Sequence, residues 1–279
     1  MKIMLLVAVL GFCPAAVADP LAIVVGDSIV REYPDDLPIQ GWGADLPKYF
    51  KPDRPWANYA WGGQSTTSFI AEGRWATALE SHPEFVLIQF GINDSQPDPA
   101  FHSDPDSTYP ANLHQMIADT RAIGAEPILV TPTAIRFVAS DGFHVARPNG
   151  LEAYVAAMKA QAAADGVGVI DMQEWSLDTY DELGMPQAQA LYGFMLYDET
   201  PDSPGIPDVI HFSHYGADQA ARMIVARLPE VSPNLAASLL PAAPPPPAAP
   251  ALPRSAAEFL VAALGAASLA GARRASPRG

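Results

Sequence analysis

Three apolar segments of this chain each lead into glycine and small polar residues, and this repeated pattern constrains the fold more than any other feature. The segments cover residues 21–25, 56–60 and 85–90. The first and third of these segments are almost wholly apolar, which is typical of strands that are buried on both faces, as in a parallel sheet, whereas the second contains Asn58 and indicates a short strand. Open parallel sheets bind ligands at the carboxyl ends of their strands, so the polar residues after each run are candidates for a functional site.

The first copy of the pattern places a serine where it could act as a nucleophile. Residues 21–25 lead into Gly26, Asp27 and Ser28, and a glycine allows the backbone to turn sharply at the end of a strand. The Ser28 hydroxyl would then lie at the mouth of a cleft, with Asp27 bracing the loop. The same three residues are also common in ordinary turns, so the assignment depends on partners elsewhere in the chain.

The rest of the chain continues the alternation of strands and helices. Strands are predicted at 126–131 and 166–171. Helices are predicted at 41–50, 109–123, 151–164, 175–184 and from about 216 to about 228. Such alternation predicts right-handed crossovers and a single parallel sheet. We therefore predict an α/β fold, a three-layer flavodoxin-like sandwich whose five-stranded parallel sheet has the strand order 2-1-3-4-5.

Asp208 and His211 supply the two groups that a serine nucleophile needs. A serine hydroxyl requires a base to accept its proton, and that base requires an orienting carboxylate. The two residues are separated by two others, and in a turn or a first helical turn this spacing brings both side chains to one side. His214 is a rival base in the same stretch. We predict that Ser28, Asp208 and His211 are the catalytic residues.

Three hydrogen-bond donors are candidates for stabilising the oxyanion that forms during acyl transfer. They are the backbone N–H of Ser28, the backbone N–H of Gly63 and the side-chain amide of Asn93, all at predicted strand ends. Each donor of this type typically contributes about 3 kcal/mol to lowering the barrier. The histidines are scattered along the chain, so we predict neither a metal site nor an organic cofactor.

These sequence blocks, in this order, resemble those of the SGNH or GDSL family of hydrolases. The matching blocks are Gly26-Asp27-Ser28, Gly63, Gly91-x-Asn93-Asp94 and Asp208-x-x-His211. Together they form a specific signature that covers the chain from about residue 21 to about residue 230. The resemblance implies the SGNH hydrolase fold and the catalytic and oxyanion roles given above. It also favours Gly63 over Gly62 as the oxyanion donor.

Within that family the chain is most similar to the rhamnogalacturonan acetylesterases. The residues that carry this similarity include Tyr33-Pro34, Gly41-Trp42-Gly43, Asn58-x-Ala60, residues 71–75 and Thr131-Pro132. It implies a secreted serine esterase that removes acetyl groups from a plant or algal polysaccharide such as rhamnogalacturonan or pectin. The polar residues 64–68 favour a sugar over a long acyl chain. The alternatives are a lipase, thioesterase or phospholipase on the same scaffold, and a non-catalytic carbohydrate-binding surface protein.

Both ends of the chain differ in composition from the middle. Residues 1–18 combine one positive charge, an apolar run and a small-residue end, which is typical of a bacterial secretory signal peptide. Residues 19–238 form the predicted hydrolase domain. A Pro/Ala-rich linker is predicted at 239–255. Residues 256–279 are predicted to form an apolar helix with a basic tail, interpreted either as a sorting or anchoring signal or as a disordered tail. We therefore expect an exported protein, which is periplasmic, attached to the cell surface or extracellular.

Charge and cysteine content narrow the range of partners. The chain has 16 Lys and Arg against 31 Asp and Glu, a net charge of −15. A chain this acidic repels nucleic acids and anionic membranes. Cys13 is the only cysteine and lies in the predicted signal peptide, so no disulfide is expected in the mature protein. The expected partner is an acetylated carbohydrate, bound by a monomer, with membrane or surface attachment through the C-terminal tail as one interpretation.

Overall fold

The computed structural model describes residues 19–135, 137–139, 142–144, 150–183, 187–195 and 206–245. The predicted signal peptide (1–18), the predicted apolar tail (256–279) and the linker beyond residue 245 lie outside these residues.

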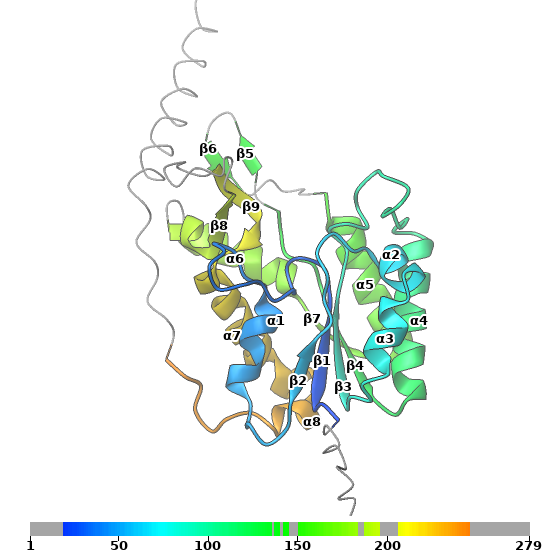
Figure 1. Ribbon diagram of the computed structural model, residues 1–279. Coiled ribbons are helices and arrows are strands. Elements are labelled where there is room, and N and C mark those ends of the chain that lie inside the picture. The colour runs from blue at the N-terminus through cyan, green and yellow to red at the C-terminus, as the bar shows by residue number, and fades with distance from the viewer. Residues whose placement is uncertain are drawn as a thin grey trace, which may run out of the picture.

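A five-stranded parallel sheet forms the centre of the molecule (Figure 1). Its strands are β1 (Ala22–Gly26), β2 (Trp56–Asn58), β3 (Phe85–Gln89), β4 (Glu126–Val130) and β7 (Gly168–Ile170). They pair in the order β2-β1-β3-β4-β7, and every pairing is parallel. The predicted sheet and its strand order are therefore confirmed.

Helices cover both faces of this sheet and complete three layers (Figure 1). One face carries α1 (Trp42–Asp45), the 3-10 helix η1 (Leu46–Tyr49), α6 (Met172–Leu183), α7 (His214–Val231) and α8 (Pro233–Ala236). The other face carries α2 (Thr66–Ala71), α3 (Arg74–Leu79), α4 (Thr108–Ala122) and α5 (Glu152–Asp165).

The apolar residues of strand β1 are explained by the helices that cover both faces of the sheet. Ala22 and Val24 pack into the hydrophobic core under α1 and α7, whereas Ile23 and Val25 pack into the core under α4 and α5. All four side chains are buried. A strand with helices on both sides buries both of its faces, so alternation with polar residues is lost.

Several elements were not predicted from the sequence. Two antiparallel pairs of strands lie outside the sheet. The pair of β5 (Phe137–Ala139) and β6 (Gly142–His144) comes between β4 and α5, and the pair of β8 (Tyr192–Met195) and β9 (Ile206–Phe212) comes after the 3-10 helix η2 (Gln187–Leu191). Helices α2 and α3 stand where only a glycine-rich turn and the residues after it were recognised. Ser65 caps α2, because Ser65 and Ser68 exchange side-chain to backbone hydrogen bonds.

The chain after α8 contacts the domain beyond the predicted boundary at residue 238. Leu239 forms a β-bridge with Phe50, and the Leu240 N–H donates to the Tyr49 carbonyl at 2.9 Å. The Pro244 carbonyl accepts a hydrogen bond from Arg222 at 2.8 Å. Within the described residues, no helix combines the length and the apolar character that crossing a membrane requires.

Candidate active site

Ser28 lies in the turn that follows β1, at the carboxyl edge of the sheet. Gly26 ends this strand, and space is the reason for the glycine, since its φ is not positive. A Cβ at this position would lie 2.6 Å from the Gln89 carbonyl oxygen and 2.5 Å from a Val30 methyl carbon. The glycine therefore allows β3 and the turn to approach β1 closely, which fixes the position of Ser28.

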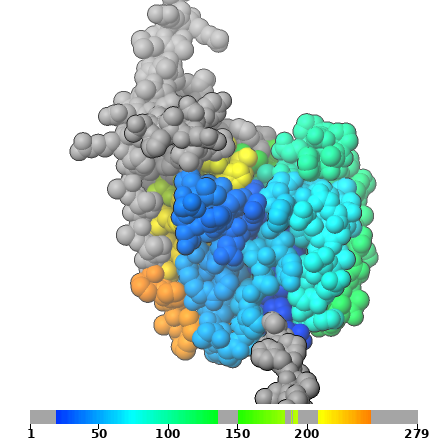
Figure 2. Space-filling view, viewed as in Figure 1, coloured from blue at the N-terminus to red at the C-terminus, as the bar shows by residue number. Residues whose placement is uncertain are grey.

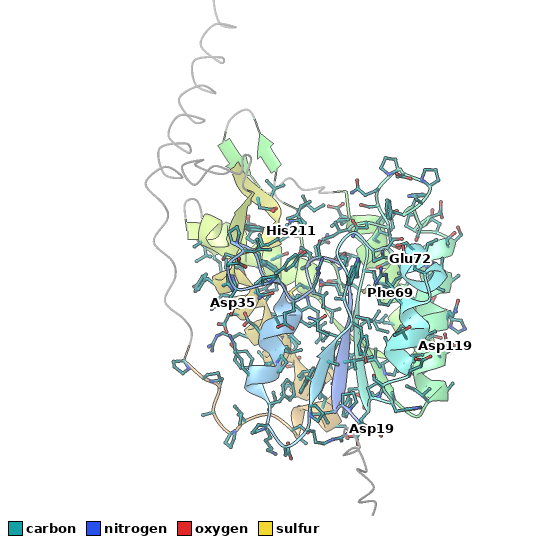
Figure 3. All side chains as sticks on the ribbon, viewed as in Figure 1. Asp19, Asp35, Phe69, Glu72, Asp119 and His211 are labelled. Atoms are coloured by element: carbon teal, nitrogen blue, oxygen red, sulfur yellow. The ribbon has the colours of Figure 1, made fainter. Side chains whose placement is uncertain are left out.

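Ser28, His211 and Asp208 form a continuous hydrogen-bonded chain. His211 Nε2 lies 2.9 Å from Ser28 Oγ, and His211 Nδ1 lies 2.8 Å from Asp208 Oδ2. Both distances suit hydrogen bonds, and the two bonds involve opposite nitrogens of the ring. The ring can therefore receive a proton from the serine hydroxyl on one side while the carboxylate holds its other side. Figure 3 labels His211 near the carboxyl edge, with Asp19 at the opposite end of the sheet.

The local backbone around Asp208 and His211 differs from the prediction. The two residues were expected in a turn or a first helical turn, but both belong to strand β9. Asp208 Oδ1 accepts the backbone N–H of Ile210 at 2.7 Å and that of His211 at 2.9 Å. These side-chain to backbone bonds fall where the pairing of β9 with β8 is irregular, and the aspartate and the histidine still meet there.

The electrostatic environment favours the ion-pair form of Asp208 and His211. Burial alone would lower the pKa of His211, but the hydrogen bond and charge of Asp208 outweigh it, and the pKa is raised. Burial alone would raise the pKa of Asp208, but the hydrogen bond from His211 and its charge lower it. Asp208 therefore stays ionised and stabilises the imidazolium that forms when His211 accepts a proton.

His214, the rival base, faces away from this arrangement. It is exposed at the start of α7, and its Nε2 lies 2.9 Å from the Leu37 carbonyl oxygen. The structure thus brings His211, and not His214, to Ser28.

The predicted oxyanion donors lie around one turn beside Ser28. Gly63 has a φ of +79°, a left-handed conformation that glycine adopts without strain. A Cβ on the preceding Gly62 would lie 3.9 Å from Ser28 Cβ, so this turn approaches the serine. Asn93 Nδ2 donates to the Gln64 carbonyl at 3.0 Å, which holds the amide against the same turn. Ser28, Gly63 and Asn93 are therefore brought together.

Asp94 supports this turn and was matched to a sequence block without being given a role. Its Oδ1 accepts hydrogen bonds from the Thr66 N–H at 3.0 Å and the Thr66 hydroxyl at 2.5 Å. Burial raises the pKa of Asp94. The side chain thus fastens the start of α2 to the turn that carries Asn93. The sequence offered one indication of this supporting role, namely that Asp94 directly follows Asn93.

The polar residues 64–68 do not form a surface for a sugar, so that reason for preferring a sugar is wrong. Gln64, Ser65, Thr66 and Ser68 are buried. Their side chains bond to one another and to Asp94. Periodicity and composition do not reveal such inward-facing polar side chains, because their partners come from distant segments.

Asp27 is buried directly behind the nucleophile. Its Oδ1 accepts the Ile29 N–H at 2.9 Å, which braces the turn, while its Oδ2 has no hydrogen-bond partner among the described residues. Burial raises the pKa of Asp27 to about 7. In the parts of the chain that the structure describes, no group of three or more His, Cys, Asp or Glu side chains could hold a metal ion.

A flavodoxin-like sandwich with a hydrogen-bonded Ser–His–Asp chain at its carboxyl edge has the architecture of an SGNH-type carboxylic ester hydrolase. The chain belongs to the GDSL-like lipase/acylhydrolase family, whose model matches residues 24–219. The resemblance inferred from the sequence blocks is therefore confirmed at the level of the family.

Two curated relatives from Bacillus subtilis (strain 168) are similar to most of the chain. The probable rhamnogalacturonan acetylesterase YesY is 33% identical over 220 residues, which are 78% of this chain and 96% of the relative. The rhamnogalacturonan acetylesterase RhgT is 34% identical over 213 residues, 75% of this chain and 89% of the relative.

Solved structures share the fold. The crystal structure of YxiM from Bacillus subtilis superposes with a TM-score of 0.63 at 26% identity, covering 77% of this chain and 57% of that chain. The acetylxylan esterase Axe2 from Geobacillus stearothermophilus superposes with a TM-score of 0.52 at 21% identity, covering 76% and 93%.

Proposed function

We propose that this ester hydrolase removes acetyl groups from a polysaccharide, with rhamnogalacturonan or pectin as the leading substrate class. The observation that carries the proposed chemistry is the chain of hydrogen bonds from Ser28 through His211 to Asp208, at 2.9 and 2.8 Å. The choice of an acetyl group on a polysaccharide is supported by the names of two relatives, YesY and RhgT.

In the proposed mechanism, Ser28 Oγ attacks the acetyl carbonyl while His211 Nε2 accepts the hydroxyl proton. The oxyanion of the tetrahedral intermediate receives hydrogen bonds from the Ser28 N–H, the Gly63 N–H and the Asn93 amide. The bond between the acetyl carbon and the sugar oxygen then breaks, and His211 gives its proton to that oxygen. A water molecule then attacks the acetyl-enzyme while His211 accepts its proton. The bond between the acetyl carbon and Ser28 Oγ breaks, His211 returns the proton to Ser28 Oγ, and acetate leaves.

Acetate release from a panel of polysaccharides tests this proposal. The panel contains acetylated rhamnogalacturonan, acetylated homogalacturonan and acetylated xylan, with the Ser28→Ala protein as the blank. We expect acetate from at least one of the pectic substrates. Wild-type protein that releases no acetate from any of them, although it hydrolyses a simple aryl acetate, would contradict the proposed substrate class.

A chain-length series separates the acetylesterase from the alternative acyl hydrolases. p-Nitrophenyl acetate, butyrate and decanoate carry the same leaving group and differ only in the acyl chain. An acetylesterase should show a kcat/KM that falls steeply with chain length, whereas a lipase, thioesterase or phospholipase requires an apolar groove and should prefer decanoate. Protein that binds glycans but hydrolyses none of the esters would favour the non-catalytic alternative.

We also propose that the enzyme is exported by the signal peptide at residues 1–18. The proposal depends on the sequence pattern alone, since these residues lie outside the described part of the chain. Cell fractionation and N-terminal sequencing of the mature protein would test it, with cleavage expected before Asp19. Full-length protein that stays in the cytoplasm with Met1 intact would contradict it.

A further inference from the structure

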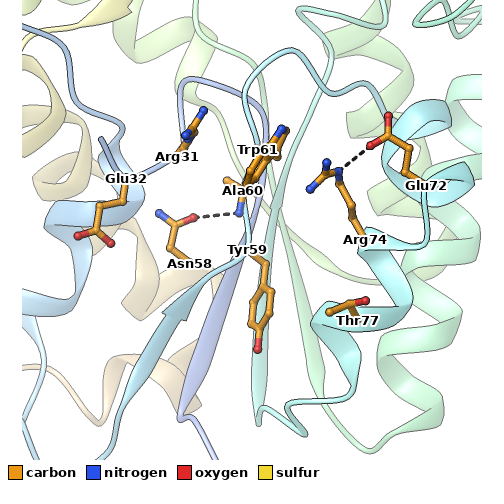
Figure 4. Close-up of a pocket in the computed structure, with 9 residues that line it drawn as sticks. All are labelled: Arg31, Glu32, Asn58, Tyr59, Ala60, Trp61, Glu72, Arg74 and Thr77. Atoms are coloured by element: carbon orange, nitrogen blue, oxygen red, sulfur yellow. Dashed lines mark hydrogen bonds and ion pairs between the residues drawn. The ribbon is translucent and has the colours of Figure 1, made fainter. Parts of the chain in front are cut away.

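A surface pocket of about 610 Å³ lies next to the candidate active site and has no role in the chemistry described above. Figure 4 shows its walls, which come from the segment after Ser28, from the end of β2 and its loop, and from α3. Trp61, Arg31 and Arg74 are its most distinctive residues. In Figure 2 the segments that carry them, in dark blue and in lighter blue to cyan, adjoin on one face of the molecule.

The indole of Trp61 holds two cations close together. The guanidinium carbon of Arg74 lies 4.3 Å from the ring centroid, and that of Arg31 lies 4.9 Å from it. Figure 4 shows the two arginines on opposite sides of Trp61. A guanidinium within about 6 Å of a tryptophan ring is attracted by the ring and held in position. Trp61 itself is 46% exposed, unusually high for a side chain of this size.

The two arginines differ in how their charges are compensated. Arg74 Nε donates to Glu72 Oε2 at 2.7 Å, so its charge has a partner. Within the described residues, the Arg31 guanidinium has ring contacts with Trp61 and Tyr33 but neither a hydrogen bond nor an ion pair. Figure 4 shows the Glu32 carboxylate directed away from it. Arg31 thus presents an uncompensated cation on a chain whose net charge is −15.

The Arg31 cation lies close to the nucleophile. A Cβ on Gly62 would lie 3.4 Å from Arg31 Nη1, 3.7 Å from the Tyr33 hydroxyl and 3.9 Å from Ser28 Cβ. The space beside the Gly62 α-carbon is therefore within contact distance of both the guanidinium and the serine. A ligand that reaches Ser28 with an ester could contact Arg31 with a neighbouring group.

We propose that Arg31, held in position by the rings of Trp61 and Tyr33, is a specificity-determining subsite that binds the carboxylate of a uronic acid residue in the substrate. The planar guanidinium presents paired N–H groups that match the two oxygens of a carboxylate. The subsite would overcome the repulsion between a polyanionic glycan and an acidic protein. This inference rests on the proposed function, because it names the sugar class that this active site selects.

Binding to an inactive protein tests the subsite without any turnover. Isothermal titration calorimetry on the Ser28→Ala protein would compare trigalacturonate with xylotriose. We expect measurable binding of trigalacturonate and an affinity at least tenfold weaker for xylotriose. Adding Arg31→Gln should weaken the binding of trigalacturonate about tenfold or more. Arg31→Lys should bind more tightly than Arg31→Gln but less tightly than arginine, because lysine keeps the positive charge but lacks the paired N–H groups of a guanidinium.

A matched control excludes a general effect of net charge. Arg227→Gln removes one exposed arginine from α7, where its contact with Glu230 is long, at 3.8 Å. This variant should bind trigalacturonate as the Ser28→Ala protein does. Equal losses in the Arg31→Gln and Arg227→Gln variants would overturn the subsite, as would equal affinity for trigalacturonate and xylotriose. Tighter binding of a sulfated trisaccharide than of trigalacturonate would overturn the assignment to a carboxylate.

Turnover then separates this inference from the proposed function. The measured quantity is the ratio of kcat/KM for an acetylated galacturonate oligomer to that for an acetylated xylo-oligosaccharide. Arg31→Gln should lower this ratio about tenfold, mainly through KM. If wild-type protein releases acetate but the ratio does not change, the subsite is wrong and the esterase stands. If no acetate is released while Arg31-dependent binding persists, the proposed function is wrong and the subsite stands.

Discussion

His211 Nε2 and Ser28 Oγ lie 2.9 Å apart although 183 positions separate the two residues in the chain. The serine follows strand β1 of the parallel sheet, whereas the histidine belongs to a hairpin outside that sheet. A backbone bond holds the two parts together, since the Gln40 N–H donates to the Phe212 carbonyl at 2.9 Å. The Gln40 side chain also bonds to both backbone groups of Tyr33, which fixes the loop after Ser28. The distance between nucleophile and base is therefore set by tertiary contacts between separate elements.

Ser28→Ala and His211→Ala should each reduce kcat/KM on an aryl acetate by about a thousandfold or more. The first removes the attacking oxygen and the second removes the proton acceptor. His214→Ala is the matched control, since His214 points to the Leu37 carbonyl, and it should cost much less. Circular dichroism would confirm that all three proteins are folded. Near-wild-type activity of Ser28→Ala would show that another group is the nucleophile.

Asn93→Ala should lower kcat by on the order of a hundredfold with little change in KM. Its amide is expected to meet negative charge that exists only in the transition state. Gln96→Ala provides the control, because Gln96 is an exposed amide in the same turn whose Nε2 donates to the Ile92 carbonyl at 3.3 Å. Steady-state kinetics on both variants would measure kcat and KM separately and so distinguish transition-state stabilisation from substrate binding. A raised KM at constant kcat for Asn93→Ala would indicate substrate binding instead.

The acid limb of the pH profile should reflect the raised pKa of His211. His211 must be neutral to accept the serine proton, so kcat/KM should rise with pH through a value above the ordinary histidine pKa of about 6.5. Asp208→Asn removes the main group that raises this pKa, leaving only the smaller effect of Asp27. The limb should therefore move to lower pH, with activity reduced by on the order of a thousandfold or more. An acid limb that stays in place in this variant would assign it to a different group.

Asp27→Asn should stabilise the protein above neutral pH. The carboxyl has a pKa of about 7 in the folded state, raised mainly by burial, against 3.8 for an unperturbed aspartate. From about pH 4 to about pH 7 the folded state holds a proton that the unfolded state has lost, so the free energy of unfolding falls as pH rises through this window. The loss is on the order of 4 kcal/mol at most.

Chemical denaturation at about pH 5 and about pH 8 would measure this effect as a difference between variant and wild type. The gain from Asp27→Asn should be larger at the higher pH. The exposed Asp106→Asn variant controls for the loss of one negative charge and should show no such pH-dependent gain. An equal gain at both pH values would mean that Asp27 ionises in the folded protein much as it does in the unfolded chain.

A chain that stops after Pro245 should be folded and as active as the full-length protein. Among the described residues, the last contact of the C-terminal region with the domain is the hydrogen bond from Arg222 to the Pro244 carbonyl. A chain that stops after Ser238 loses this bond and the pairing of Leu239 and Leu240 with η1 and Phe50, so its Tm should be lower.

Thermal melts and aryl acetate assays on the two truncated forms test this boundary. Aggregated or inactive protein after truncation at Pro245 would show that later residues are needed by the domain. Fractionating cells that express the full-length and the Pro245-terminated forms tests the predicted anchoring role of residues 256–279. Identical distributions would favour the disordered-tail interpretation.

The sheet could be predicted because strands that are buried on both faces are apolar at nearly every position, and this pattern is visible in the sequence. Residues such as Val24 and Val25 must both be apolar when helices pack on each side. The order of the strands was predicted from the flavodoxin-like class that the alternation of strands and helices indicates. The placement of Gly63 and Asn93 beside Ser28 was also predictable, because carboxyl ends of parallel strands meet at one edge. Asp208 and His211 belong to an antiparallel pair outside that sheet, and they were predicted from their chemistry and their spacing.

Features that depend on contacts between distant segments could not be predicted in this way. The inward orientation of Thr66 depends on Asp94, which is 28 positions away. The β-conformation of His211 depends on pairing with a partner strand, and local spacing suggested a helical turn instead. The cluster of Arg31, Trp61 and Arg74 combines three segments, none of which carries a recognisable motif for binding an anion.

The closeness of the Arg31–Trp61–Arg74 cluster to the active site also limits how substrate preference can diverge. Arg31 is in the loop that begins with Ser28, and Trp61 is in the turn that contains Gly63. A mutation that changes the glycan preference therefore acts on segments that also hold the nucleophile and an oxyanion donor. A change of preference to a neutral glycan should therefore be easiest by substituting the side chain at position 31. Insertions or deletions in either loop should instead reduce turnover, because they would also displace the nucleophile or an oxyanion donor.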